Sequence, residues 1–223
     1  MITRILATVE GAFTLLRLAG PRIFIRKLLR QFYCRDAQIG MAVNLETYER
    51  PDVSCRIQYD LRPATPADMD EVWQLVHTES KESIEILLYM KWLYQCGFRN
   101  WYVARTTETG EICFVDSVIG PEDNAVLEKH FKGWFPQLKE GEVLVEGAYA
   151  VEKYRGQGIT TCANVDINLL CKRQGYKTII LYLNKNNFPS LKLAEKMGFS
   201  RFEEVPISKT FFLNNKKFSR QAC

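Results

Sequence analysis

Residues 151–160 read Val-Glu-Lys-Tyr-Arg-Gly-Gln-Gly-Ile-Thr and lie between a predicted strand and a predicted helix. They belong to a longer stretch, Glu142–Phe199, whose pattern predicts a strand, a glycine-bearing turn, a helix, a second strand and a second helix. Gly156 and Gly158 allow a ligand to approach the main chain closely. The first turn of the following helix offers unpaired N–H groups and the positive end of the helix dipole. The pattern therefore predicts a phosphate-binding loop.

Two common phosphate motifs do not fit this turn. The P-loop requires a lysine before its Ser or Thr, and Gly158-Ile159-Thr160 has none. The dinucleotide-binding fingerprint requires a third glycine, where this chain has Thr161. A bare G-x-G also occurs where a chain merely turns tightly, so the residues around it must decide.

Two flanking segments supply that context. Arg155-Gly156-Gln157-Gly158-Ile159 resembles the acyl-CoA pyrophosphate loop, R/Q-x-x-G-x-G/A, of the GCN5-related N-acetyltransferase (GNAT) family. Residues 187–199 (Asn-Phe-Pro-Ser-Leu-Lys-Leu-Ala-Glu-Lys-Met-Gly-Phe) are similar to that family's N-x-x-A-x-x-L-Y-x-K-x-G-F segment. Residues 61–68 look like its usual first strand and helix. The resemblance covers residues 57–213 and implies an α+β fold with a mixed, mostly antiparallel central sheet flanked by helices.

The resemblance also implies how a coenzyme would bind. The strand before the loop would diverge from its neighbour, and the pantetheine arm would enter between them and pair with main-chain groups near Ala150 and Val151. The diphosphate would be held by the N–H groups of Arg155, Gly156, Gln157, Gly158, Ile159 and Thr160. Asn187 would lie near the pantetheine or act only as a helix N-cap. The co-substrate would be acetyl-CoA or another acyl-CoA, with no metal.

The sequence departs from the family pattern at two positions. Thr160 stands where the loop motif ends in Gly or Ala, and its hydroxyl could add a bond to phosphate or alter the fit of the coenzyme. Ala194 stands where the family commonly has the tyrosine that protonates the departing thiolate. The acid would then be Ser190, Tyr182 or water, or none, because a thiol pKa of about 8.5 makes the thiolate a fair leaving group.

The general base must come from the strand or the turn. Glu146 is the best-placed candidate, since a carboxylate in a partly apolar cleft would have a raised pKa. The alternative is a strand-edge glutamate that faces water. Tyr149 and Glu152 rank lower. Cysteines 162 and 171 have no histidine nearby in the sequence, so we expect buried thiols rather than nucleophiles.

Composition narrows the class of protein. Apolar residues make up 47% of the 223 residues, enough for a full core. The seven cysteines are scattered and form no C-x-x-C pair, so a reduced, cytoplasmic protein is expected. With two histidines and no Cys/His cluster, a zinc site is not expected. A net charge of +4 is too balanced to indicate a nucleic-acid partner.

Residues 1–35 are predicted to form a basic amphipathic helical arm, with seven Arg or Lys side chains against one acid. The arm is too charged for a transmembrane span or a secretory signal. It could lie on the inner surface of an anionic membrane, contact an acidic acyl carrier protein, or pack on the protein's own core or on a second subunit of a homodimer. Residues 36–56 show no strong period and are predicted to connect this arm to an acyltransferase domain, 57–223.

The remaining pattern predicts strands over 57–62, 101–105, 112–119, 143–151, 178–183 and 199–212, the last range holding two strands. Helices are predicted from Pro66, with Thr65 as N-cap, and over 81–96, 158–174 and 187–197, with a helical insertion in 121–141. The apolar side chains of 81–96 would form core or line an acyl pocket.

The expected function is acetyl transfer from acetyl-CoA to the primary amine of a small molecule. Two alternatives stay open from the sequence: a long-chain N-acyltransferase supplied by acyl carrier protein, and an acyl-CoA sensor without turnover. The acceptor pocket carries no motif that identifies the amine.

Overall fold

The computed structural model describes residues 16, 17, 20, 21, 25, 33–131, 133–210, 213–216 and 218. In chain order the elements are β1 (Tyr33–Asn44), β2 (Tyr59–Pro63), α4 (Pro66–Gln74), α5 (Lys81–Cys96), β3 (Trp101–Thr106), β4 (Ile112–Ile119), α6 (Asn124–Phe131), β5 (Glu142–Ala150), α7 (Ile159–Arg173), β6 (Thr178–Asn184), α8 (Phe188–Lys196), β7 (Ser200–Thr210) and β8 (Leu213–Lys216). Short 3₁₀ turns occupy Leu75–His77, Pro121–Asp123 and Glu152–Tyr154.

The described strands form one sheet of eight, in the order β2-β3-β4-β5-β6-β1-β7-β8. β5 and β6 are parallel, and the other neighbouring pairs of described strands are antiparallel. Parallel neighbours require a crossover, which α7 supplies. The predicted mixed, mostly antiparallel sheet is therefore confirmed.

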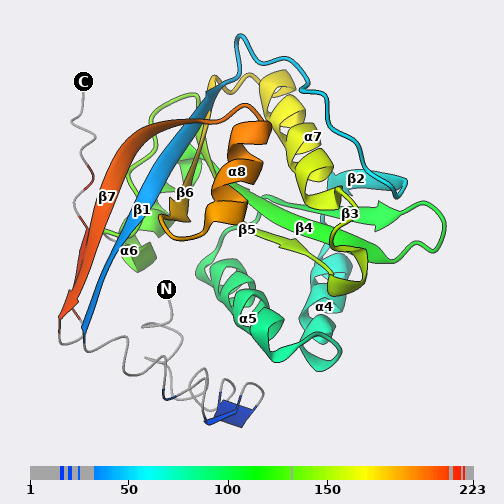
Figure 1. The fold of residues 1–223 in the computed structure, drawn as a ribbon, viewed down its shortest axis with the longest axis horizontal. Coiled ribbons are helices and arrows are strands. Elements are labelled where there is room, and N and C mark those ends of the chain that lie inside the picture. The colour runs from blue at the N-terminus through cyan, green and yellow to red at the C-terminus, as the bar shows by residue number, and fades with distance from the viewer. Residues whose placement is uncertain are drawn as a thin grey trace.

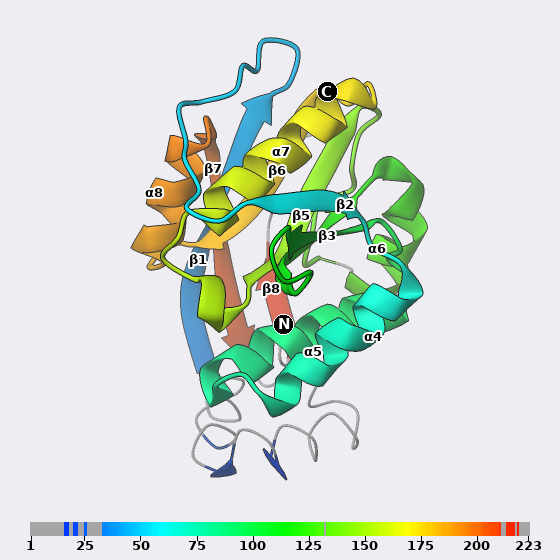
Figure 2. The ribbon, with the colours of Figure 1, turned by 90° about the vertical axis from the view of Figure 1, so that its right-hand side faces the viewer.

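Helices cover both faces of the middle of this sheet (Figures 1 and 2). α7 contacts β4 and β5 from one side, and α5 contacts β5 from the other with α4 beside it. All eight residues of β4 are buried as a result. Tyr48 fixes α8 beside α7, because its hydroxyl donates to the Met197 carbonyl (3.0 Å) and accepts from Asn168 Nδ2 (3.2 Å).

Most of the predicted elements from residue 57 onward are confirmed within a few residues. The prediction of two strands within 199–212 is wrong, because β7 alone spans Ser200–Thr210 and β8 begins at Leu213. The connector predicted over 36–56 is wrong for residues 36–44, which belong to β1 and lie between β6 and β7 in the sheet. Ile39, Met41 and Val43 alternate and are buried, but the residues between them include Gly40 and Ala42. A strand whose outer positions are small rather than polar gives a weak period-2 signal. The sheet therefore begins before the predicted boundary at residue 56.

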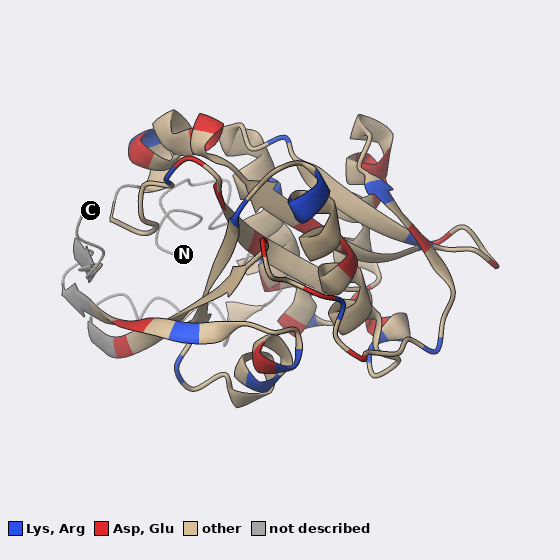
Figure 3. Ribbon diagram, turned by 90° about the horizontal axis from the view of Figure 1, so that it is seen from above, with Lys and Arg blue, Asp and Glu red and all other residues tan. Residues whose placement is uncertain are grey.

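The predicted helical arm, 1–35, falls mostly outside the described residues, and the prediction is wrong for residues 33–35, which belong to β1. Within the part of the chain that the structure does describe, no helix is long and apolar enough to span a membrane. Lys and Arg residues are interspersed with Asp and Glu over the described elements (Figure 3). Pairs of neighbouring charged side chains therefore influence the sites described below more than an extended surface of one charge does.

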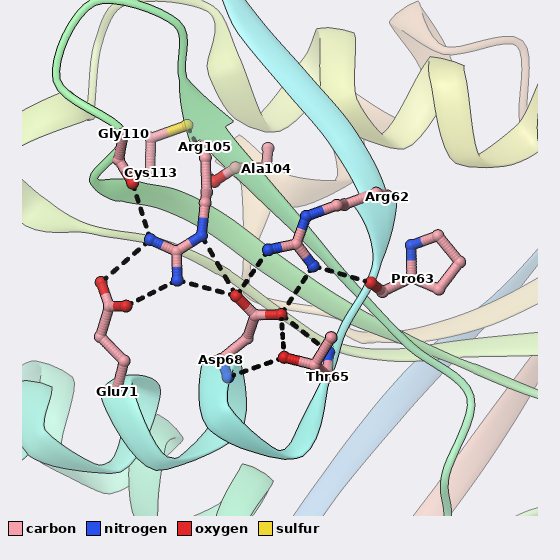
Figure 4. A network of polar contacts seen from close by, with 9 residues as sticks. All are labelled: Arg62, Pro63, Thr65, Asp68, Glu71, Ala104, Arg105, Gly110 and Cys113. Atoms are coloured by element: carbon pink, nitrogen blue, oxygen red, sulfur yellow. Dashed lines mark hydrogen bonds and ion pairs between the residues drawn. The ribbon is translucent and has the colours of Figure 1, made fainter.

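One such network attaches α4 to the sheet (Figure 4). Asp68 is 3% exposed, and its carboxylate accepts two hydrogen bonds from Arg62 (2.7 and 2.8 Å) and further bonds from Arg105 (2.7 and 3.1 Å). Thr65 donates its N–H and its hydroxyl to the same carboxylate and caps the helix, as predicted. These donors, Arg62 first, hold the pKa of Asp68 well below its usual range.

We predict that Asp68→Asn lowers the free energy of unfolding by about 2 kcal/mol at neutral pH, because two arginines lose their shared carboxylate. The folded-state pKa of Asp68 is depressed, so its contribution is full above the unfolded-state pKa and is lost as pH falls through the folded-state value. Urea unfolding of both proteins from pH 7 to pH 2 should show the gap narrowing in acid. A gap that is constant across this range would contradict the assigned role.

Candidate functional site

β5 and β6 separate after a short region of pairing. Their parallel ladder joins Glu142–Leu144 to Thr178–Ile180, and in these fully described strands it ends there. β5 continues to Ala150 paired with β4, and β6 continues to Asn184 paired with β1. One edge of β5 is therefore open beyond Leu144, and the predicted divergence of the two strands is confirmed.

A bulge in β5 decides which of its side chains share a face. Ser117 pairs with Glu146 and Val115 pairs with Tyr149, so β5 carries one residue more than β4 in this interval. Gly147 lies in the bulge with φ of +94°, a conformation that favours glycine. Because Val115 and Ser117 point to the same side of the sheet, Glu146 and Tyr149 do so too.

Glu146 is half-buried and contacts α5. The hydroxyl of Tyr89 donates to Glu146 Oε1 at 2.9 Å. Tyr89 is 2% exposed, and burial, followed by the neighbouring Glu146 carboxylate, raises the pKa of its phenol well above the usual value. Tyr89 therefore remains a neutral donor that orients Glu146 at neutral pH.

Tyr182 lies across the opening from Glu146. Leu144 and Ile180 are paired, and the side chains two residues further along each strand, Glu146 and Tyr182, point to the same side of the sheet. The Tyr182 hydroxyl donates to Glu203 Oε1 at 2.7 Å. A Cβ at Gly40 would lie 3.0 Å from the Tyr182 ring, so glycine at that position lets the ring cross β1.

Tyr149 is a donor rather than a base. Its hydroxyl donates to the Glu79 carboxylate, and the Arg155 guanidinium lies 5.3 Å from its ring centroid. Burial, reinforced by the bond to Glu79, raises the pKa of the Tyr149 phenol. A phenol that donates to a carboxylate and has a raised pKa is not a base at neutral pH, so Tyr149 is a weaker candidate than Glu146 for that role.

The loop before α7 presents a row of open donors. Among the described residues no acceptor faces the main-chain N–H groups from Gly156 to Thr160. Gly156 and Gly158 reach this shape with φ of +74° and +88°. The Arg155 N–H, which the resemblance also assigns to diphosphate, instead donates to the Glu152 carbonyl at 3.1 Å. Five successive donors at the start of α7 fit a diphosphate group.

The segment 45–58, here called the strap, runs along α7 and ends against this loop (Figure 2). Lys172 Nζ donates to the Tyr48 carbonyl (2.7 Å), and Arg50 pairs with Asp166. At the other end the Arg56 N–H donates to the Gln157 carbonyl at 2.8 Å. The strap therefore fixes the outer side of the loop.

The Arg155 side chain forms hydrogen bonds to the end of β5 and the start of α5. Its Nε donates to the Ala150 carbonyl (3.0 Å), Nη2 donates to Ser83 Oγ (2.8 Å), and Nη1 pairs with Glu152 (3.2 Å). Glu152 also accepts from the Ser80 and Ser83 hydroxyls at the start of α5. These bonds, Ser80 first, lower the pKa of Glu152 and tie the loop to α5. The Arg155 side chain is 45% exposed, and its hydrogen bonds go to Ala150 and Ser83 rather than toward the open donors.

Ala150 and Val151 differ in what they offer a ligand. The Val151 N–H donates to the Cys113 carbonyl (3.1 Å), and the Val151 carbonyl accepts from Tyr154 (2.9 Å). Alternate residues of an antiparallel strand direct their main-chain groups to opposite edges, so those of Ala150 face the open edge. Of the two residues predicted to pair with pantetheine, Ala150 alone has main-chain groups that face it.

α8 begins and packs as its sequence indicates. Asn187 is the N-cap, and its side chain accepts from the Ser190 N–H at 3.4 Å. Ala194 is 1% exposed, so the position that carries tyrosine in the family motif is filled by core packing. Ser190 lies in the first turn of α8, half-buried.

Two thiols on α7 are buried, as predicted. Cys162 is 3% exposed and Cys171 is fully buried. Burial raises the pKa of both thiols, that of Cys171 to about 12. Neither is a thiolate nucleophile at neutral pH.

Several residues at this site are not predicted from the sequence. Tyr89 and Glu79 bond to residues of β5 that are 57 and 70 positions away in the chain. Glu203 is 21 positions from Tyr182, and Arg50 of the strap is 116 positions from Asp166. Of these residues, only Tyr89 could have been singled out from its neighbours in the sequence. A tyrosine within an otherwise apolar helix face often buries its hydroxyl against a hydrogen-bond partner.

Comparisons with known proteins identify the fold. No protein-family model matches the sequence, and no curated protein matches it. Among solved structures it is similar to the GCN5-related glucosamine N-acetyltransferase region of a fungal multi-domain GH3 β-N-acetylglucosaminidase, at 13% identity and a TM-score of 0.61 over 84% of this chain. It is also similar to GCN5-related N-acetyltransferases from Sphaerobacter thermophilus (16%, 0.54, 85% of this chain) and Colwellia psychrerythraea (12%, 0.51, 83%).

The chain spans 22% of the fungal protein, 56% of the Sphaerobacter protein and 60% of the Colwellia protein. At these identities the similarity establishes the fold, and the chain has the GNAT acetyltransferase fold. The fold that the sequence motifs imply is thereby confirmed.

The fit between Gly158 and the strap gives a prediction for stability. A Cβ on Gly158 would lie under 3.0 Å from the Ser54 carbonyl oxygen, whereas a Cβ on Gly156 would meet nothing within 4 Å. Both glycines have positive φ, so Gly156→Ala controls for backbone strain. We expect Gly156→Ala to cost about 1 kcal/mol and Gly158→Ala at least about 2 kcal/mol more in denaturant unfolding. Equal losses would show that the strap does not press on the loop.

Proposed function

We propose that the protein transfers an acetyl group from acetyl-CoA to a primary amine, by direct attack of the amine within a ternary complex. The observation that carries the proposal is the row of open N–H groups from Gly156 to Thr160 at the end of the open edge of β5. The GNAT fold supports acyl transfer in general, and this juxtaposition supports an acyl-CoA as donor.

The open donors suit the coenzyme diphosphate, and the Ala150 main chain suits a pantetheine amide. The Ala150 carbonyl already accepts from Arg155 Nε, but a carbonyl oxygen has a second lone pair. Glycine at 156 leaves open space where a Cβ would stand between the main chain and a phosphate, whereas glycine at 158 makes room for the Ser54 carbonyl of the strap. The acyl group would then lie in the opening between β5 and β6, near Glu146.

Glu146 is proposed as the general base. The amine nitrogen attacks the thioester carbonyl carbon, Glu146 takes the proton that the nitrogen loses, and the C–S bond breaks with release of the coenzyme thiolate. Tyr89 orients the carboxylate through its 2.9 Å hydrogen bond. The thiolate takes a proton from water or from a hydroxyl beside the opening, for which Tyr182 and Ser190 are the candidates.

Glu146→Gln tests the base. We expect kcat with a reactive amine at pH 7 to fall about 100-fold, while the Kd for acetyl-CoA stays within about twofold of wild type. Steady-state kinetics and calorimetry measure the two quantities. A variant with wild-type kcat across the pH range would exclude Glu146 as the base.

Tyr89→Phe tests the orienting bond. The Tyr89 hydroxyl stabilises the carboxylate form of Glu146. Removal of this hydroxyl should therefore shift the acidic limb of the plot of kcat/KM against pH to higher pH, by about half a unit or more. A role in packing alone would lower stability and leave the limb in place. Trp92→Phe, on the same helix, is the matched control for packing.

A further inference from the structure

Four basic side chains lie on the strap or on the loop, and the structure pairs three of them. Arg50 pairs with Asp166, Lys153 with Glu111 (2.6 Å), and Arg155 with Glu152 (3.2 Å). The fourth, Arg56, has an exposed side chain for which the described part of the chain provides no hydrogen-bond or ion-pair partner.

Arg56 is nonetheless held in place beside the open donors. Its N–H donates to the Gln157 carbonyl, in the middle of the loop, at 2.8 Å. The Ser54 carbonyl, two residues earlier, lies against Gly158 closely enough to exclude a Cβ there. The main chain on which this guanidinium is mounted therefore adjoins the row of N–H groups from Gly156 to Thr160.

Arg56 also lines a pocket of about 680 Å³. Its lining includes Arg56, Gln58, Lys153, Tyr154 and the turn 106–109, which supplies three threonines and Glu108. Hydroxyl and amide groups suit a base or a ribose, and the volume exceeds that of a nucleoside. The Glu108 carboxylate disfavours a phosphate beside the 106–109 turn. Lys153 is already paired with Glu111, so Arg56 is the lining cation that has no partner among the described residues and can bind a phosphate.

We propose that Arg56 and this pocket bind the adenosine 3′-phosphate end of coenzyme A, so that the donor is a free coenzyme A thioester and not an acyl carrier protein. This inference rests on the proposed function. An acyl carrier protein presents phosphopantetheine without adenosine or a 3′-phosphate, so nothing in it would occupy the pocket or meet Arg56. Arginine suits the terminal phosphate because its planar fork can donate two hydrogen bonds to one phosphate group.

The test is calorimetric titration of the full chain with coenzyme A, 3′-dephospho-coenzyme A and S-acetyl-4′-phosphopantetheine at one salt concentration. Wild type should bind coenzyme A about tenfold more tightly than the dephospho form, and the phosphopantetheine more weakly still. Arg56→Gln should reduce the ratio for the first two ligands to about one, while its affinity for dephospho-coenzyme A stays unchanged. Arg50→Gln, on the same strap but paired with Asp166, should keep the wild-type ratio.

The contrary outcomes separate this inference from the proposed function. Equal wild-type affinity for coenzyme A and its dephospho form, or a ratio that survives in Arg56→Gln, would overturn the inference alone. Phosphopantetheine that binds as tightly as coenzyme A would overturn it in favour of a carrier-protein donor. A wild type that binds none of the three would overturn the proposed function and the inference with it.

Discussion

The separation of β5 from β6 after Leu144 is the constraint on which the site depends. A paired sheet satisfies its own main-chain groups and offers a ligand nothing at that edge. Here β5 stays paired with β4, while β6 follows β1, so the Ala150 main chain faces an opening and Glu146 lies on one side of it. The same strand leads into the loop whose five N–H groups lack acceptors among the described residues. One departure from regular pairing thus brings a strand edge, a carboxylate and a row of donors into one place.

Contacts from remote parts of the chain hold this arrangement open. The strap presses on Gly158 from outside, and the Arg155–Glu152–Ser83 contacts tie the loop to α5 from inside. Tyr89 and Tyr149 carry hydroxyls to Glu146 and Glu79 across the same interface. The loop and the strand that carries Glu146 are therefore coupled through polar groups whose rearrangement would leave donors or acceptors unpaired.

Local signals explain why much of this could be predicted. Glycines 156 and 158, the Asn187 cap and the Thr65 cap act within a few residues of themselves, so their sequence positions suffice. β1 could not be placed this way, because its neighbours β6 and β7 lie more than 130 residues further along the chain and Gly40 and Ala42 blur its alternation. The hydrogen bond from Tyr89 to Glu146 and that from Arg155 to Ser83 likewise depend on how α5 packs on β5. The sequence singles out the loop and the carboxylate as candidates, and tertiary packing determines their environment.

The central claim is that the main-chain N–H groups from Gly156 to Thr160 bind the diphosphate of coenzyme A. Titration of ¹⁵N-labelled protein with desulfo-coenzyme A, which cannot react, follows these amides individually. The account predicts that the amide signals of these five residues shift together and saturate with the binding isotherm. Saturable binding that leaves all five signals in place would contradict it, because the coenzyme would then be held elsewhere on the molecule.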